Sequence, residues 1–191
     1  MIFRLRFIPN ALCVLRMLLV VPVAWLLLEQ DFRRTMWLFA FAAATDGLDG
    51  FLAKRCGWTS ELGKILDPLA DKILLVGTYI ALAVVGLVPL WLAVTVVGRD
   101  VVITVGAILY NCIYGYPNGR PTGISKLNTL CQIVFALLIV GSHAIGGSPE
   151  LAITVLGALV LVTTVVSGLD YVITYAQKAI AASGERRGSA T

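Results

Sequence analysis

The sequence has few charged side chains, one histidine and no closely spaced pair of cysteines. Charged residues make up 14% of the 191 positions, whereas soluble domains carry about 25%. Hydrophobic residues make up 59%, and the mean hydropathy is +0.90. These values exclude an ordinary soluble domain and predict an all-α integral membrane protein with one compact helical domain.

The spacing of the cysteines and the distribution of basic residues exclude further classes of protein. The cysteines are scattered, form no CxxC motif and mostly lie in or beside apolar runs, which indicates small buried residues rather than a disulfide framework. They are Cys13, Cys56, Cys112 and Cys131. The net charge of +4 comes without a basic cluster that contains interleaved aromatic residues, so no nucleic-acid partner is expected. No Ser–base or Cys–His arrangement is visible, so we expect no covalent nucleophile.

Six apolar segments are long enough to form transmembrane helices. They cover residues 9–28, 36–55, 61–85, 89–112, 124–145 and 151–176. A short basic and apolar segment, residues 1–8, precedes them and suits an anionic membrane surface. We expect one membrane domain over residues 1–178 and a polar C-terminal tail over residues 179–191, of which residues 183–191 should be disordered.

Lysine and arginine residues gather on one side of this six-span arrangement. They are Arg4, Arg6, Lys54, Arg55, Arg120, Lys126, Lys178, Arg186 and Arg187. Arg33 and Arg34 are the exceptions. The positive-inside rule then predicts a multi-pass protein of the inner (cytoplasmic) membrane whose termini and polar site face the cytoplasm.

The acidic stretch from Asp46 to Asp71 interrupts the apolar pattern. Asp46 and Asp49 are three residues apart, and Asp67 and Asp71 are four apart, so on helices each pair shares one face. A carboxylate at the bilayer centre costs about 2.5–3.5 kcal/mol, so four of them require something that offsets this cost. Oxygen ligands without a nearby His or Cys pair favour Mg²⁺ or Mn²⁺. All four aspartates are therefore candidate metal ligands.

The spacing of this stretch resembles the signature of the CDP-alcohol phosphotransferases. The matching positions are Asp46-x2-Asp49-Gly50-x2-Ala53-Lys54-x8-Gly63-x3-Asp67-x3-Asp71. Lys54 is the one departure, because the family has arginine there, and Arg55 follows at once. The resemblance implies a membrane enzyme that transfers a phosphatidyl group from CDP-diacylglycerol to an alcohol and releases CMP. It also implies two metal ions and a homodimer.

The resemblance assigns roles within the motif. Asp46, Asp49 and Asp67 would ligate metal, whereas Asp71 would contact the second ion and take the proton from the acceptor hydroxyl as the catalytic base. The remaining motif residues would bind the CDP group, the small ones by leaving room for cytidine and the basic ones by balancing the diphosphate charge. These CDP-binding candidates are Gly50, Ala53, Lys54, Arg55 and Gly63.

The acceptor alcohol is predicted from residues outside the motif. The acceptor-binding candidates are Arg16, Arg99, Lys126 and Asn128. The segments IPNALCVLR, TDGLDG, GRDVVI and ISKLNT resemble the cardiolipin synthases of this family. The rival group, phosphatidylglycerophosphate synthase, typically has a lysine where this chain has Asn128 and a further arginine after Arg99. Since fewer cations suit an acceptor with one negative charge, phosphatidylglycerol is favoured over glycerol 3-phosphate.

Two other classes of membrane protein remain possible. An intramembrane prenyltransferase and a cation transporter also bury carboxylates, although neither explains one hairpin with interleaved glycines and cations.

Arg99 and Asp100 are adjacent and should point about 100° apart on a helix, so we expect them not to pair. Asp170 falls at the depth of the four aspartates, and it serves either a hydrogen bond within the bundle or a function.

Overall fold

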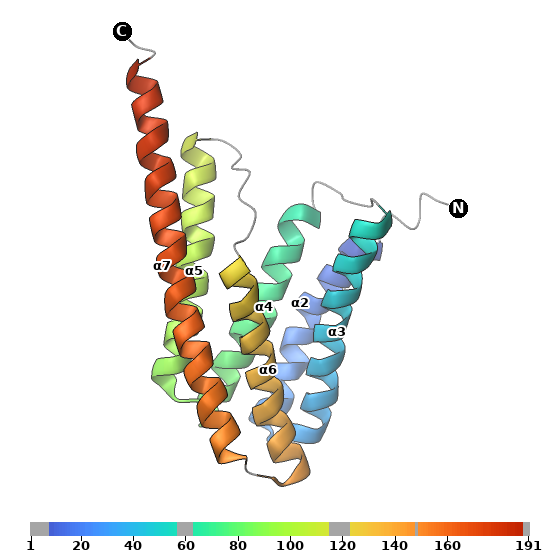
Figure 1. The fold of residues 1–191 in the computed structure, drawn as a ribbon. Coiled ribbons are helices and arrows are strands. Elements are labelled where there is room, and N and C mark those ends of the chain that lie inside the picture. Colours follow the sequence, from blue (N-terminus) through green and yellow to red (C-terminus); the bar gives the residue numbers. More distant parts are fainter. Residues whose placement is uncertain (1–7, 57–62, 115–122, 148, 189–191) are drawn as a thin grey trace, which may run out of the picture.

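The computed structural model describes an all-helical chain. It describes the backbone of residues 8–56, 63–114, 123–147 and 149–188, and the side chains of 14–45, 72–106, 123–147, 149–174 and 177. The helices are α2 (Ile8–Leu28), α3 (Phe32–Cys56), α4 (Gly63–Val84), α5 (Leu90–Tyr114), α6 (Gly123–Ile145) and α7 (Glu150–Gly188). Figure 1 shows them as a bundle with both chain termini at the same end.

These six helices correspond to the six predicted apolar segments, with two differences. α3 begins at Phe32 rather than Met36, because the Asp31 carboxylate accepts a hydrogen bond from the backbone N–H of Arg34 at 3.1 Å and caps the helix. α7 continues to Gly188, so the prediction of a disordered tail is wrong for most of that segment. Residues 176–187 are rich in alanine, glutamine, lysine and arginine, which favour helix.

Three short turns connect helices at the end opposite to the termini. Each contains one residue with positive φ, namely Gln30 (59°), Gly86 (81°) and Gly146 (77°). In each turn a backbone N–H reaches a carbonyl five residues earlier, as from Leu87 to Leu82 at 2.9 Å, which ends the preceding helix in a left-handed cap. These caps allow consecutive helices to run antiparallel and to pack closely.

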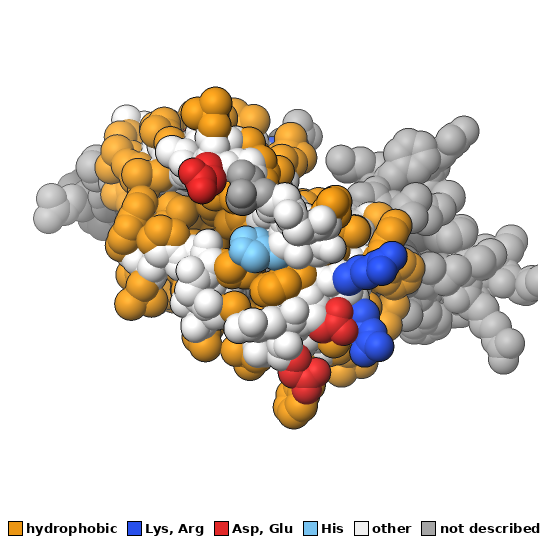
Figure 2. Space-filling view, turned by 90° about the horizontal axis from the view of Figure 1, so that it is seen from below, with side chains coloured by type: hydrophobic (Ala, Val, Ile, Leu, Met, Phe, Trp, Pro, Cys, Tyr) orange, Lys and Arg blue, Asp and Glu red, His pale blue; other side chains and the backbone are white. Residues whose placement is uncertain are grey.

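Figure 2 looks onto this end of the molecule. Arg33 and Arg34, the two cations that depart from the charge bias, lie in the first turn of α3 at this end, and Arg34 Nε is 3.4 Å from Asp31 Oδ2. His143 also lies here, with its ring centroid 5.1 Å from that of Phe32. The chain's single histidine is therefore remote from the acidic motif.

The helix contacts join the bundle into one body. α2 packs against α3 and α4, α6 packs against α3 and α7, and α5 packs against α4 and α7. The two halves of the acidic motif, on α3 and α4, are thus joined through α2.

The interior of the bundle is divided into an apolar half and a polar half. The apolar half lies toward the short turns and includes Leu27, Phe39, Leu82, Phe135 and Ile139, all 2% exposed or less. The polar half lies toward the motif end and contains polar side chains from five helices: the buried Arg16, Arg99, Asp100, Asn128, Gln132, Thr163, Thr164 and Ser167, and the half-buried Lys72. Along each of these five helices, these polar residues lie on the motif side of the apolar core.

The outer faces of the helices are apolar. Trp25 (63% exposed), Trp37 (68%) and Val84 (70%) are examples from α2, α3 and α4. Within the described residues, Gly123–Ile145 and Glu150–Thr174 are long and apolar enough to cross a membrane, judged by length and composition. An apolar outside combined with a polar half inside is consistent with a membrane protein.

Candidate active site

The two halves of the acidic motif lie at the same end of the bundle. Asp46 and Asp49 occupy the last part of α3, and Asp67 and Asp71 lie near the start of α4. Figure 1 shows both helix ends on the side where the chain termini lie. The helical backbone keeps each aspartate pair one turn apart on one face.

Side-chain positions are described for none of the predicted metal- and CDP-binding residues. These are Asp46, Asp49, Gly50, Ala53, Lys54, Arg55, Gly63, Asp67 and Asp71. Among the side chains that are described, no group of three or more His, Cys, Asp or Glu residues could hold a metal ion. Four carboxylates on two helix ends at one end of the bundle fit a hard divalent cation, which prefers oxygen ligands. The individual roles of these residues stay predictions.

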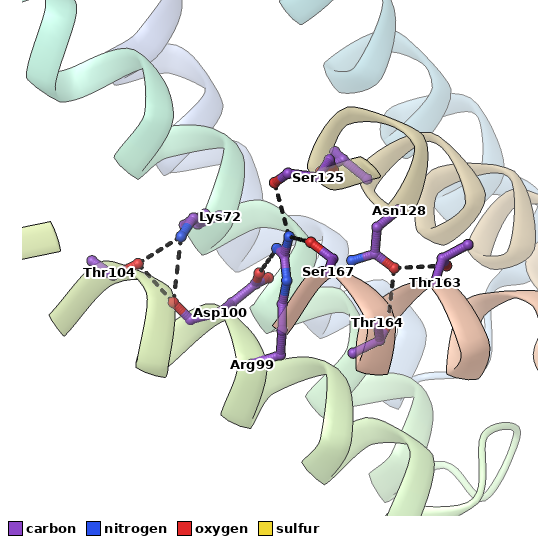
Figure 3. A network of polar contacts seen from close by, with 10 residues as sticks. Lys72, Arg99, Asp100, Thr104, Ser125, Asn128, Thr163, Thr164 and Ser167 are labelled. Carbon is purple, nitrogen blue, oxygen red and sulfur yellow. Dashed lines mark hydrogen bonds and ion pairs between the residues drawn. The ribbon is translucent and has the colours of Figure 1, made fainter. Parts of the chain in front are cut away.

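Arg99 of α5 is the central cation of the polar half. It is 8% exposed, and its Nη1 donates to Asp100 Oδ1 at 2.6 Å. Its Nη2 donates to Ser125 Oγ of α6 at 2.8 Å and to Ser167 Oγ of α7. Figure 3 shows the guanidinium between these partners. Three helices therefore fix one buried guanidinium.

The pairing of Arg99 with Asp100 corrects the sequence-based expectation. The two Cα–Cβ bonds leave the helix in different directions, but the long arginine side chain bends back to reach the carboxylate of its neighbour. A buried charge is costly unless it is paired, and Asp100, itself 4% exposed, supplies that charge. The guanidinium is consequently already neutralised before any ligand binds.

Lys72 links the motif helix to the network around Arg99. It follows Asp71 directly in α4, and its Nζ donates to Thr104 Oγ1 at 2.7 Å and to the backbone oxygen of Asp100 at 3.3 Å. Figure 3 shows both contacts reaching across to α5. A movement of α4 near the motif would therefore also change the positions of the residues that bind Arg99.

Asn128 lies one turn further into α6 than Ser125 and is fully buried, at 0% exposed. Its Oδ1 accepts hydrogen bonds from the hydroxyls of Thr163 and Thr164 on α7, both at 2.9 Å. The side chain at this position is thus a neutral amide held between two hydroxyl groups. Its burial on the same α6–α7 interface as Ser125 and Ser167 places it beside the Arg99 network.

The two other acceptor-binding candidates differ in burial. Arg16 is 1% exposed on α2, the helix that packs against both motif helices. Lys126 is exposed, and its position two residues from Asn128 puts it on a different face of α6. The structure thus brings Arg99 and Asn128 to one interface and does not bring Lys126 there.

Three hydroxyl residues of α7 complete the network and are not among the predicted site residues. Thr163, Thr164 and Ser167 bind Asn128 and Arg99. Their spacing of three and four residues within the apolar segment LVTTVVSGLDY is a helical stripe, and this pattern is the signal that could have identified them. Isolated threonine and serine are common in apolar helices, where they bond to their own backbone, so the stripe is a weak signal alone.

Comparison with known proteins adds independent information. The family model for CDP-alcohol phosphatidyltransferase matches residues 6–169. Cardiolipin synthase (CMP-forming) of Rattus norvegicus is 32% identical over 181 residues, which cover 86% of this chain and 60% of that protein. The cardiolipin synthase (CMP-forming) of Homo sapiens gives the same values. The chain thus spans about 60% of the length of these two curated relatives.

A second kind of relative is equally similar. A probable phosphatidylglycerophosphate synthase of Mycobacterium tuberculosis is 33% identical over 178 residues, which cover 88% of this chain and 81% of that protein. Identities of 32% and 33% do not separate the two reactions. The matched residues include the whole acidic motif and helices α2 to α6. The chain therefore belongs to the CDP-alcohol phosphatidyltransferase family.

Proposed function

We propose that this chain is a membrane enzyme that transfers a phosphatidyl group from CDP-diacylglycerol to phosphatidylglycerol, giving cardiolipin and CMP. A bond forms between the acceptor oxygen and the phosphorus of the lipid phosphate, and the bond from that phosphorus to CMP breaks. Membership of the family supports the transfer, and the motif carried by the ends of α3 and α4 supports its location. The alternatives of a prenyltransferase and a cation transporter lose their support for the same reason.

The four aspartates supply the reactive end of the site. Asp46, Asp49 and Asp67 would hold two divalent ions, and the family generally depends on such ions. Ions bound there would neutralise charge on the diphosphate and on the leaving CMP. Asp71 would take the proton from the acceptor hydroxyl, because it is the last acid of the motif and directly precedes Lys72, whose contacts lead to the acceptor network.

The other motif residues would bind the nucleotide. Gly50, Ala53 and Gly63 have little or no side chain, so the cytidine could approach the helix backbones closely. Lys54 and Arg55 would balance the diphosphate charge. Because Lys54 lacks the planar fork of the family's arginine, Arg55 is the better candidate for a bidentate contact.

The pairing of Arg99 and the lack of charge on Asn128 are the reasons for the proposed acceptor. Arg99 is already paired with Asp100 at 2.6 Å, and the buried Asn128 adds hydrogen bonds but no charge. A phosphomonoester such as glycerol 3-phosphate carries close to two negative charges, whereas the diester phosphatidylglycerol carries one. The described polar half offers little uncompensated positive charge at the α5–α6–α7 interface, so the diester suits it better. Glycerol 3-phosphate, the acceptor of phosphatidylglycerophosphate synthases, is the alternative.

A product assay with both acceptors tests this choice. Purified protein given labelled CDP-diacylglycerol with phosphatidylglycerol and glycerol 3-phosphate should make the four-chain lipid far faster than phosphatidylglycerophosphate. Asn128→Lys should move the product ratio toward glycerol 3-phosphate by about tenfold or more, because one charged hydrogen bond is worth about 1.5–3 kcal/mol. Asn128→Met, with similar length and no charge, is the control and should not produce this shift. Rapid phosphatidylglycerophosphate formation by the unmodified protein, with phosphatidylglycerol inert, would reverse the acceptor assignment.

We also propose that the chain crosses the inner membrane six times, with both termini and the active site on the cytoplasmic side. The apolar outer faces of the helices and the concentration of Lys and Arg at the motif end support this orientation. The homodimer is an expectation from the family resemblance.

A further inference from the structure

Asp170 is a half-buried acid that the proposed mechanism leaves unused. It lies on α7 one turn beyond Ser167, toward the motif end of the bundle. Its Oδ2 is buried and has no hydrogen-bond partner in the part of the chain that the structure describes. An ionisable side chain inside an apolar bundle is costly unless a partner satisfies it. The carboxylate oxygen therefore calls for a donor that the described helices do not supply.

The neighbouring residues of α7 face the polar network. Ser167, three residues earlier, binds Arg99. Tyr171 faces α5, because a Cβ built on Gly106 would lie only 3.2 Å from the tyrosine ring. On the helix surface Asp170 lies about 60° from Ser167, on the side away from Tyr171. The burial of its Oδ2 agrees with a position facing the bundle interior rather than the outside.

The cations of this region are engaged with other groups. Arg99 is bound to Asp100, Ser125 and Ser167, and Lys72 is bound to Thr104 and to the backbone of Asp100. The donor for Asp170 is therefore better supplied by an uncharged hydroxyl than by a side-chain cation. Arg99 still has one buried donor, Nε, without a partner among the described residues, and this donor suits a phosphate oxygen.

An acceptor with a phosphoglycerol group has both a hydroxyl that can donate to Asp170 and a phosphate oxygen that can accept from Arg99 Nε. We propose that Asp170 accepts a hydrogen bond from the glycerol hydroxyl that does not react, while Arg99 Nε donates to the adjacent phosphate; this inference rests on the proposed function. The terminal hydroxyl loses its proton to Asp71 and forms the new bond to phosphorus. The middle hydroxyl stays intact, and its O–H can donate to Oδ2 of Asp170. Asp170 would thus select acceptors that have a second hydroxyl next to the reacting one.

A comparison of two acceptors tests this role. Phosphatidylglycerol and phosphatidyl-1,3-propanediol differ only in the middle hydroxyl. Unmodified protein should favour phosphatidylglycerol by about tenfold or more in kcat/KM, as expected for a hydrogen bond to a charged group. In Asp170→Ala and in the shape-preserving Asp170→Asn, the ratio should fall toward one, because the KM for phosphatidylglycerol rises while that for the propanediol lipid stays unchanged. The ratio is independent of the folded fraction, since both acceptors meet the same preparation.

Glu150→Gln is the matched control, because it removes an exposed carboxylate from the opposite end of the same helix; it should leave the ratio unchanged. Asp170 variants that keep the full ratio, or that lose both activities equally, would overturn the inference. If the protein uses glycerol 3-phosphate instead of phosphatidylglycerol, the proposed acceptor fails, and the same comparison with 3-hydroxypropyl phosphate decides the role of Asp170. If none of the four acceptors is used, both proposals fail.

Discussion

Arg99 shows how a charged residue is accommodated inside this apolar bundle. Its charge is balanced by the adjacent Asp100, and its Nη2 donates to both Ser125 and Ser167. Breaking a buried pair by removing one partner typically costs about 3–5 kcal/mol. The Nη2 contacts of Arg99 join α5 to α6 and α7, in addition to any contact with substrate.

The sequence allowed the acidic residues to be identified but not their partners. Asp46, Asp49, Asp67 and Asp71 stand out because carboxylates are rare among apolar residues. The pairing of Arg99 with Asp100 could not be predicted, because helix spacing fixes only the Cβ direction and not the path of a long side chain. Thr163 and Thr164 were missed because their contacts with Asn128 depend on how α6 and α7 pack.

Asp71→Asn should lower the rate of phosphatidyl transfer by about 10²–10⁴-fold, the usual contribution of a general base. The amide keeps the size of the side chain but cannot take the proton. Binding of CDP-diacylglycerol, measured separately by equilibrium binding, should change little. A variant that kept more than about a tenth of the rate would show that Asp71 is not the base.

At the scale of the helices, apolar segment length predicted all six elements but misplaced two ends. The start of α3 depends on the cap from Asp31, and the end of α7 depends on helix-forming residues in a polar segment. Both are local effects that a search for apolar runs does not detect. The pattern of helix contacts was likewise not predictable, because many of the residues that pack together come from segments far apart in the chain.

The contact between α2 and α4 is particularly close at Gly77. A Cβ built on Gly77 would lie 2.6 Å from Val20 Cγ1, whereas one built on Gly98 of α5 would meet nothing within 4 Å. Gly77→Ala should therefore destabilise the fold by about 1–3 kcal/mol and lower the unfolding midpoint in detergent by roughly 2–12 °C.

Gly98→Ala is the control and should keep or raise that midpoint, because alanine favours helix by about 1 kcal/mol over glycine. Combining Gly77→Ala with Val20→Ala should recover part of the loss by removing the overlapping methyl groups. Equal effects of the two glycine substitutions would argue against a close contact between α2 and α4.

The whole molecule has apolar outer faces and a polar interior toward one end. This distribution of apolar and polar residues agrees with a membrane protein whose site lies toward the side that carries most Lys and Arg. It also explains why four carboxylates are tolerated: they lie at the end of the bundle where the helices already bury polar groups.

The orientation predicts that Cys56 faces the cytoplasm. An impermeant thiol reagent added to intact cells should leave Cys56 unlabelled, and permeabilised cells should show labelling that Cys56→Ser removes. Gly147→Cys, placed in the Cys56→Ser background at the exposed turn of the opposite end, should be labelled from outside. The reverse pattern would invert the topology.

Metal-dependent release of CMP tests the central claim most directly. Protein stripped of metal should be mixed with CDP-diacylglycerol and phosphatidylglycerol, and CMP and lipid products should be measured together. We expect no product in excess EDTA, and equal amounts of CMP and cardiolipin once Mg²⁺ or Mn²⁺ is restored, because the predicted ligands are all oxygen donors. Undiminished turnover in excess EDTA, or cardiolipin formed without CMP, would contradict metal-dependent phosphatidyl transfer at the α3–α4 motif.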